Sequence, residues 1–163
     1  MRELLLREPY SCTPVCRIVI ALEPLTSAVG PAGDRLFLPL RITGGSIKGV
    51  GYEKRILAGD DFAVMYADEK LTHDGRFVAE DPVGDVLVWY TGVSLAGEGA
   101  YDELLDGQLP LAASCRLSVN FVSTGTLWRS LTRRPLVGVG SFDGVAGRLD
   151  VTVLTVSEAD ARN

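Results

Sequence analysis

The chain of 163 residues has little histidine and little cysteine: one histidine, His73, and three cysteines, Cys12, Cys16 and Cys115. A single histidine excludes a histidine-rich metal site, and any Ser-His-Asp or Cys-His arrangement would have to use His73. An odd number of cysteines does not suit the disulfide framework of a secreted protein. Cys12 and Cys16 have the spacing to form a bridge or bind a metal, but no second ligand pair exists. We therefore expect free, buried thiols.

Long apolar runs and clustered basic residues are also missing. No run approaches the roughly 20 residues of a membrane-spanning helix, and the opening MRELLLREPY is too short and too acidic for a signal peptide. The net charge is −5 with scattered Lys and Arg, which argues against a nucleic-acid surface. Arg129, Arg133 and Arg134 have helical spacing and fit a solvated face. We expect a cytoplasmic protein that binds neither membranes nor nucleic acids.

What is present is a series of short alternating runs. Leu36, Leu38, Leu40 and Ile42 occupy every second position, which is the period of a strand with one buried face. Similar runs recur at intervals of about ten residues, as in a barrel or a sandwich. The candidate strands are residues 16–23, 35–43, 48–57, 62–67, 70–78, 85–92, 114–123, 136–142 and 148–156.

Two longer connections break this pattern. Residues 99–107 predict one or two helical turns, and residues 124–134 predict a second short helix that Pro135 ends. So many strands with so little helix leave unpaired edges, which closure removes. We predict a single all-β domain over residues 1–163, a closed or nearly closed antiparallel barrel of about nine or ten strands with one or two short helices. A barrel larger than eight strands has room for a small ligand.

A glycine-rich corner follows the run at 35–43. Gly44 and Gly45 are expected to break that strand, and Gly49 follows. The corner suggests a phosphate-binding loop, but it lacks the Gly-Lys-Ser/Thr ending and no helix follows it. We interpret these glycines as corners or bulges of the barrel wall.

Several motifs occur in a specific order. This order resembles the DUF3237 family, also called UPF0311, over about residues 15–157. The resemblance implies a lipocalin-like β-barrel with an internal cavity, often dimeric, so we expect a homodimer. It implies no agreed activity. The motifs that carry it are G-x-R at 33–35, PLRITGG at 39–45, Gly49, ILAGDDF at 56–62, GRF at 75–77, GDVLVWYTGV at 84–93, RLSVNF at 116–121 and LVGVG at 136–140.

The chain departs from the family pattern at Asp60, where a small residue is usual, at Phe62, where Trp is usual, and at Val119, where Pro is usual. These departures indicate a divergent member with its own pocket.

Three residues are candidates for catalysis. Asp61 aligns with the family's aspartate, and a carboxylate in an apolar cavity can move a proton at neutral pH; the alternative is a turn aspartate that accepts from backbone N–H groups. His73 shares parity with Leu71 and so faces inward as a general acid or base, or as a hydrogen-bonded core residue. Arg76 either pairs with Asp61 or a ligand oxygen inside the barrel, or faces solvent.

The candidates for substrate binding are an arginine and five aromatic residues. Arg116 has the same two alternatives as Arg76. The aromatic residues either shape an apolar pocket with hydroxyl donors or belong to the core, and two adjacent ones cannot both face inward. These aromatic residues are Tyr52, Tyr66, Trp89, Tyr90 and Trp128.

Two classes of function fit these residues. The first is a cofactor-independent isomerase, cyclase or lyase without a metal, which acts on an apolar or polyketide-like molecule in secondary metabolism. The second is a non-catalytic barrel that binds or carries a small molecule. A cavity containing Asp61 or His73 beside a tyrosine hydroxyl would favour the enzyme. An interior lined only by carbon or filled by side chains would count against it.

Overall fold

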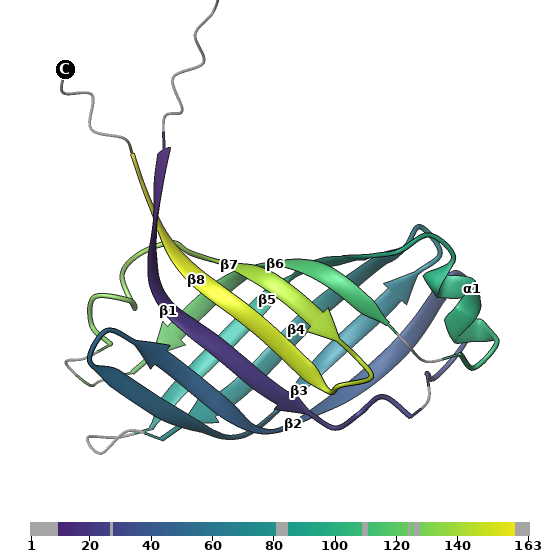
Figure 1. The fold of residues 1–163 in the computed structure, drawn as a ribbon, viewed down its shortest axis with the longest axis horizontal. Helices are drawn as coiled ribbons and strands as arrows, with labels where there is room; N and C mark the ends of the chain where they lie inside the picture. Colours follow the sequence, from purple (N-terminus) through teal and green to yellow (C-terminus); the bar gives the residue numbers. More distant parts are fainter. Residues whose placement is uncertain are drawn as a thin grey trace, which may run out of the picture.

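The computed structural model describes residues 10–26, 28–80, 85–108, 111–123, 125 and 128–158. The strands of this part of the chain form one closed antiparallel barrel, in which each strand pairs with the next in sequence and β8 pairs with β1 (Figure 1). The predicted all-β closed barrel is therefore confirmed. Its eight strands are β1 (Tyr10–Leu22), β2 (Arg35–Gly49), β3 (Tyr52–Tyr66), β4 (Lys70–Ala79), β5 (Val86–Ala96), β6 (Ala112–Val122), β7 (Leu136–Asp143) and β8 (Arg148–Glu158).

The strand number is eight rather than the nine or ten expected, because three candidate runs merge into two long strands. The glycine corner does not end β2. Gly45 has a φ of 131°, and a Cβ at this position would lie 2.0 Å from the carbonyl oxygen of Val19 on β1. Glycine therefore lets the two backbones approach closely while the strand bends and continues to Gly49. Residues 62–67, expected as a separate strand, lie mostly within β3.

Inward-facing apolar side chains of the described strands pack into one core inside the barrel. Eight strands give an interior just wide enough for side chains to fill or for one small ligand. One cavity among these side chains has a volume of about 10 Å³, room for about one water molecule. It is lined by apolar residues and one tyrosine: Ile18, Ile20, Phe77, Tyr90, Leu117, Val119, Leu149 and Val151.

One short helix, α1 (Ala100–Leu105), lies within the predicted segment 99–107. In the second predicted helix, residues 128–133 form consecutive turns instead, and positions 124, 126 and 127 lie outside the described residues. Trp128 and Leu131 are nevertheless buried, so this segment closes one end of the barrel with apolar side chains. None of the described helical residues form a segment long and apolar enough to cross a membrane.

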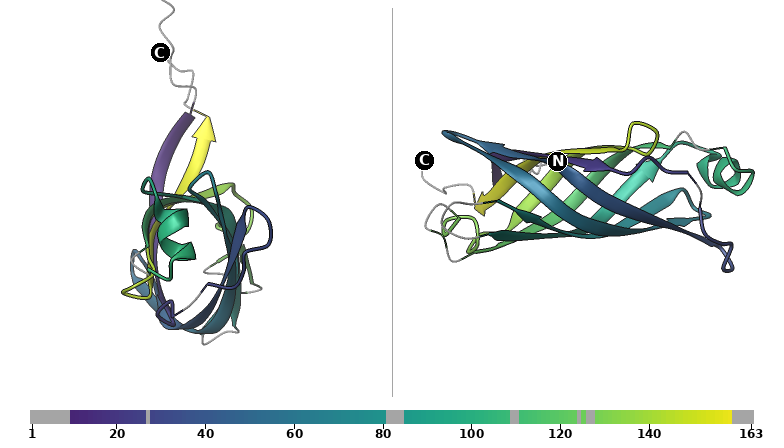
Figure 2. Two further views of the ribbon diagram at one scale, coloured as in Figure 1. Left: turned by 90° about the vertical axis from the view of Figure 1, so that its right-hand side faces the viewer. Right: turned by 90° about the horizontal axis from the view of Figure 1, so that it is seen from below.

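The two ends of the barrel differ. α1 stands across one mouth, between β5 and β6 (Figure 2). At the other end, the start of β1 and the end of β8 continue as a paired ribbon that projects from the barrel (Figure 1). Cys12 lies on this ribbon and is exposed, whereas Cys16 and Cys115 are buried inside the barrel. The expectation of three buried thiols is therefore wrong for Cys12.

Candidate functional site

Asp61 faces the barrel interior from the middle of β3. It shares parity with the buried Ala63 and Met65, whereas its neighbours Asp60 and Phe62 are exposed. In the sheet it lies opposite Leu40 of β2 and Gly75 of β4. Its side chain is 1% exposed, so this carboxyl group is surrounded by protein on all sides.

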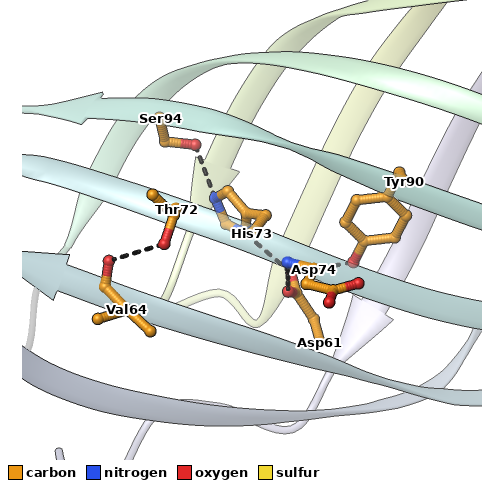
Figure 3. Close-up of polar contacts among 7 residues, drawn as sticks. All are labelled: Asp61, Val64, Thr72, His73, Asp74, Tyr90 and Ser94. Atoms are coloured by element: carbon orange, nitrogen blue, oxygen red, sulfur yellow. Dashed lines mark hydrogen bonds and ion pairs between the residues drawn. The ribbon is translucent and has the colours of Figure 1, made fainter.

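Asp61, His73 and Ser94 form a continuous hydrogen-bonded array inside the barrel (Figure 3). His73 Nδ1 lies 2.8 Å from Asp61 Oδ2, and His73 Nε2 lies 2.8 Å from Ser94 Oγ. The three residues come from β3, β4 and β5, which are consecutive in the barrel. His73 is 3% exposed and Ser94 is not exposed at all.

The Asp61 carboxylate accepts two further hydrogen bonds. The Tyr90 hydroxyl donates to Oδ2 at 3.0 Å, and the backbone N–H of Asp74 donates to Oδ1 at 3.2 Å. Burial, and then the nearby Asp61 charge, raise the pKa of Tyr90 well above its ordinary value, so its hydroxyl keeps its proton. Tyr90 therefore holds the carboxylate in place.

These contacts define the protonation pattern of the histidine ring. Because the Asp61 oxygen is an acceptor, Nδ1 carries the ring hydrogen. In the neutral ring Nε2 then has a free electron pair, which accepts the hydrogen bond from the Ser94 hydroxyl. This is the order of groups in a Ser-His-Asp arrangement, with the acid on Nδ1 and the hydroxyl on Nε2.

The array has the groups to transfer a proton, but Ser94 is placed unlike the nucleophile of an acyl-transfer site. Ser94 lies within β5, paired with Leu71 of β4 and Cys115 of β6, and its backbone forms part of the sheet. A nucleophilic serine also needs N–H donors directed at an oxyanion. The arrangement is thus that of a general base. Asp61 orients the His73 ring, and the basic nitrogen Nε2 is hydrogen-bonded to the Ser94 hydroxyl.

For an enzyme, the sequence predicts a cavity that contains Asp61 or His73 beside a tyrosine hydroxyl. Only the second part of this expectation, the neighbouring hydroxyl, is met. Asp61 and His73 do lie beside a tyrosine hydroxyl, that of Tyr90. The small cavity next to Tyr90, however, is lined by carbon, and His73 and Ser94 are 3% and 0% exposed. Every buried side-chain nitrogen and oxygen in the described part has a hydrogen-bond partner. A substrate would therefore have to displace side chains to reach His73.

Both candidate arginines lie on the outer wall. Arg76 is 3.6 Å from Asp74 and stacks over Trp89 at 5.4 Å, and the Trp89 indole N–H donates to Asp74 at 3.0 Å. Arg116 is exposed on β6. For both arginines the solvent-facing alternative is the one observed, and neither joins the Asp61 array.

The remaining candidate aromatic residues lie away from the array. Tyr52 and Trp128 pack edge to face at 5.5 Å at the end of the barrel opposite α1. Tyr52 shares a hydrogen bond with Cys16, and burial raises the pKa of Tyr52 to about 12 and that of Cys16 to about 11. Tyr66, at the end of β3, lies under Arg35.

Ser94 is the member of the array that the sequence analysis missed. The candidate strand ended at residue 92, but β5 continues to Ala96. Ser94 shares parity with Val86, Val88 and Tyr90, all buried. Extending the alternation by two residues would have placed Ser94 inside. In the described ranges, no group of three or more His, Cys, Asp and Glu side chains is arranged to hold a metal ion.

The fold and the array define a closed β-barrel with a buried acid–histidine–hydroxyl site. The chain belongs to the DUF3237 family, described as proteins of unknown function, which matches residues 10–158. A search of curated proteins finds no match.

Solved structures with the same fold come from bacteria and a fungus. A conserved protein of unknown function from Rhodopseudomonas palustris is 21% identical with a TM-score of 0.76, covering 91% of this chain and 98% of that one. A β-barrel-like protein from Acinetobacter baumannii is 19% identical with a TM-score of 0.70, covering 94% and 99%. A protein described as an enzyme from Penicillium herquei is 12% identical with a TM-score of 0.66, covering 91% and 96%. At these identities the likeness shows the fold alone.

Proposed function

We propose that this barrel is a cofactor-independent enzyme that moves a proton within a small, mostly apolar or polyketide-like molecule. The observation that supports it is the Asp61–His73–Ser94 array, which gives the chain's one histidine an oriented ring in an interior without bulk water. A structurally similar protein is described as an enzyme, which is consistent with catalysis on this fold.

In the proposed reaction His73 acts first as a base and then as an acid. Nε2 takes a proton from a carbon or hydroxyl group next to a carbonyl, and the new positive charge is stabilised by Asp61 at Nδ1. The imidazolium then returns the proton to another atom of the same molecule, or to a leaving group. Atoms balance within one substrate, as in an isomerisation, a cyclisation or an elimination.

Ser94 marks the position of the reacting group. Its Oγ lies 2.8 Å from Nε2, the distance at which a substrate's acidic group would have to lie. We propose that the substrate replaces the Ser94 hydroxyl at Nε2. In the absence of substrate, the Ser94 hydroxyl therefore provides the hydrogen bond that the buried His73 Nε2 requires.

Deuterium exchange tests this proposal without knowledge of the natural substrate. Cyclohexanone and acetophenone are incubated with the protein in D₂O, and loss of the α-proton signals is followed by NMR. We expect faster exchange than in buffer, a loss of about 100-fold or more in His73→Gln, and retained exchange in Ser94→Ala. Asp61→Asn should lower the rate, while Asp60→Asn, its outer-wall neighbour, should not.

The competing function is a non-catalytic binding or carrier barrel. Probes that shift protein resonances on binding, yet exchange no faster than with His73→Gln, would favour this function and overturn the enzyme.

Two further predictions concern the location of the protein in the cell and its oligomeric state. A cytoplasmic location is supported by the free thiols of Cys12, Cys16 and Cys115. A homodimer is supported by the large apolar side chains of Phe62 and Trp89, 69% and 42% exposed on the outer wall. Light scattering coupled to size-exclusion chromatography would measure the oligomeric state.

A further inference from the structure

The array lies nearer to the α1 end of the barrel than to the other end. Ser94 is two residues from the last residue of β5, and it lies beside Cys115 of β6. The next inward-facing row toward α1 consists of Ala96, Ala113 and Phe142, which lie opposite one another on β5, β6 and β7. One layer of side chains therefore separates Ser94 from this rim.

An open groove of about 600 Å³ lies on this rim. Its volume is within the range of small-molecule sites, which are commonly about 300–1,000 Å³. Small and apolar side chains dominate the groove, with two serine hydroxyls and one carboxylate. The lining residues are Leu95, Ala96, Gly97, Ala112, Ala113, Ser114, Ser141, Phe142 and Asp143.

Phe142 connects the groove with the buried site. Its ring packs edge to face against the His73 imidazole, with 5.5 Å between the ring centroids. The same residue lines the groove. Movement of this one side chain would therefore bring the groove into contact with the histidine.

Besides the buried side chains of Ala100, Tyr101 and Leu104, the carboxylate of Glu69 in the β3–β4 turn holds the start of α1. Glu69 Oε1 accepts the N–H of Gly99 at 2.9 Å, and Oε2 accepts the N–H of Tyr101 at 2.9 Å. The Glu69 carbonyl also accepts the N–H of Ala96 at 3.1 Å. Glu69 has a φ of 63°, which is unusual for a residue other than glycine.

We infer that a small, mostly apolar molecule with a carbonyl or hydroxyl oxygen enters at the α1 end, binds in the rim groove and reaches His73 through the place now filled by Phe142, with Glu69 holding this entrance closed. The inference rests on the proposed function, because it supplies the path by which a substrate reaches a histidine that is 3% exposed. The apolar lining selects the body of the molecule, and the exposed Ser114 and Ser141 hydroxyls on the outer side of the groove are available to its oxygen.

Chemical modification of His73 measures this entrance directly. Because the chain has one histidine, the absorbance of N-carbethoxyhistidine formed with diethyl pyrocarbonate reports His73 alone. Glu69→Ala should raise the modification rate about tenfold or more, since it removes two hydrogen bonds to a charged group, and Glu69→Gln should raise it less. Glu80→Ala is the matched control, because Glu80 pairs with Arg55 at the opposite end and its loss should change the rate less than about twofold.

A second pair of variants tests the inner step. Phe142→Leu should raise the modification rate, whereas Phe77→Leu, which also shortens an inward phenylalanine but lies away from the groove, should not. Hydrogen exchange measured by mass spectrometry should show faster exchange in residues 97–108 of Glu69→Ala and unchanged exchange in β1 and β8. Global loosening of the barrel in that variant would overturn the inference, as would equal modification rates in Glu69→Ala and Glu80→Ala.

The experiments distinguish an error in the proposed entrance from an error in the proposed enzymatic reaction. Faster His73 modification in Glu69→Ala with no catalysed deuterium exchange would support the entrance and remove the proposed reaction. Unchanged modification with intact exchange of cyclohexanone would overturn the entrance and leave the reaction. Titration of cyclohexanone into the labelled protein should shift the amide resonances of Ala96, Gly97 and Ala113; shifts confined to the Trp128 end would contradict the groove.

Discussion

Gly75 determines whether Tyr90 can hold Asp61. A Cβ at position 75 would lie 2.0 Å from Cζ and 2.3 Å from the hydroxyl oxygen of Tyr90. The Tyr90 ring therefore occupies the space that any other residue at position 75 would fill. Tyr90 is 2% exposed, and the cavity beside it has room for only about one water molecule, so a large displacement of the ring would disturb the packed core. The hydrogen bond from Tyr90 to Asp61 thus depends on a glycine on the strand between them.

Gly75→Ala should destabilise the protein by about 1–3 kcal/mol, the usual cost of overpacking a filled core. It should also displace the Tyr90 hydroxyl from Asp61. The matched control is Gly97→Ala, where an added Cβ meets nothing within 4 Å. Urea unfolding measures both, and we expect the control to change the free energy of unfolding by less than about 1 kcal/mol. Equal stability of the two variants would show that Tyr90 adapts without cost.

At the scale of elements, alternation predicted the inward faces correctly and the strand ends less well. The predicted buried positions of residues 36–42 are all buried in β2. The break expected at Gly44 and Gly45 did not occur, because a bend and an end have the same local sequence signal. Only the partner strand decides between them: β1 pairs with β2 on both sides of the bend.

The seam between β1 and β8 carries an ion pair whose effect depends on pH. Arg17 forms two hydrogen bonds to Asp150, at 2.8 and 2.6 Å, and Arg148 adds a third at 2.7 Å. The hydrogen bond from Arg17 is the largest cause that lowers the pKa of Asp150. A carboxyl group with a lowered folded pKa stabilises the fold above its unfolded pKa of about 4, and this contribution is lost as pH falls through the folded value.

Asp150→Asn should therefore lower the Tm near neutral pH, and this difference from the wild type should shrink as the pH falls below about 4. Arg17 is exposed, so we expect a shift of less than about 4 °C. Scanning calorimetry at both pH values measures it, with Asp34→Asn, an exposed turn residue, as the control. A difference that grows on acidification would contradict this assignment.

At the scale of the whole molecule, barrel closure decides which candidate residues meet. Parity alone indicated that Asp61 and His73 face inward, but not that they touch. Their contact depends on the register of β3 with β4, which places Asp61 opposite Gly75, two residues beyond His73. Arg76 has the opposite parity from Gly75 and so lies outside. A distance between side chains on different strands requires the register and the tilt, which no single strand's sequence contains.

Closure also predicts how the protein folds. The last pairing joins β1 to β8, with Tyr10 opposite Glu158, so the chain must bring its two ends together before the barrel has no free edge. Such non-local pairing is slow, and we expect refolding in the range of milliseconds to seconds. Opening any one strand pair exposes two edges and the shared core, so unfolding should be cooperative.

Trp128 is fully buried opposite α1, whereas Trp89 is on the outer wall. In Trp89→Phe, fluorescence then reports Trp128 alone, and its urea transition should coincide with that of far-UV circular dichroism. An earlier fluorescence transition would show that the Trp128 end opens while the strands remain paired.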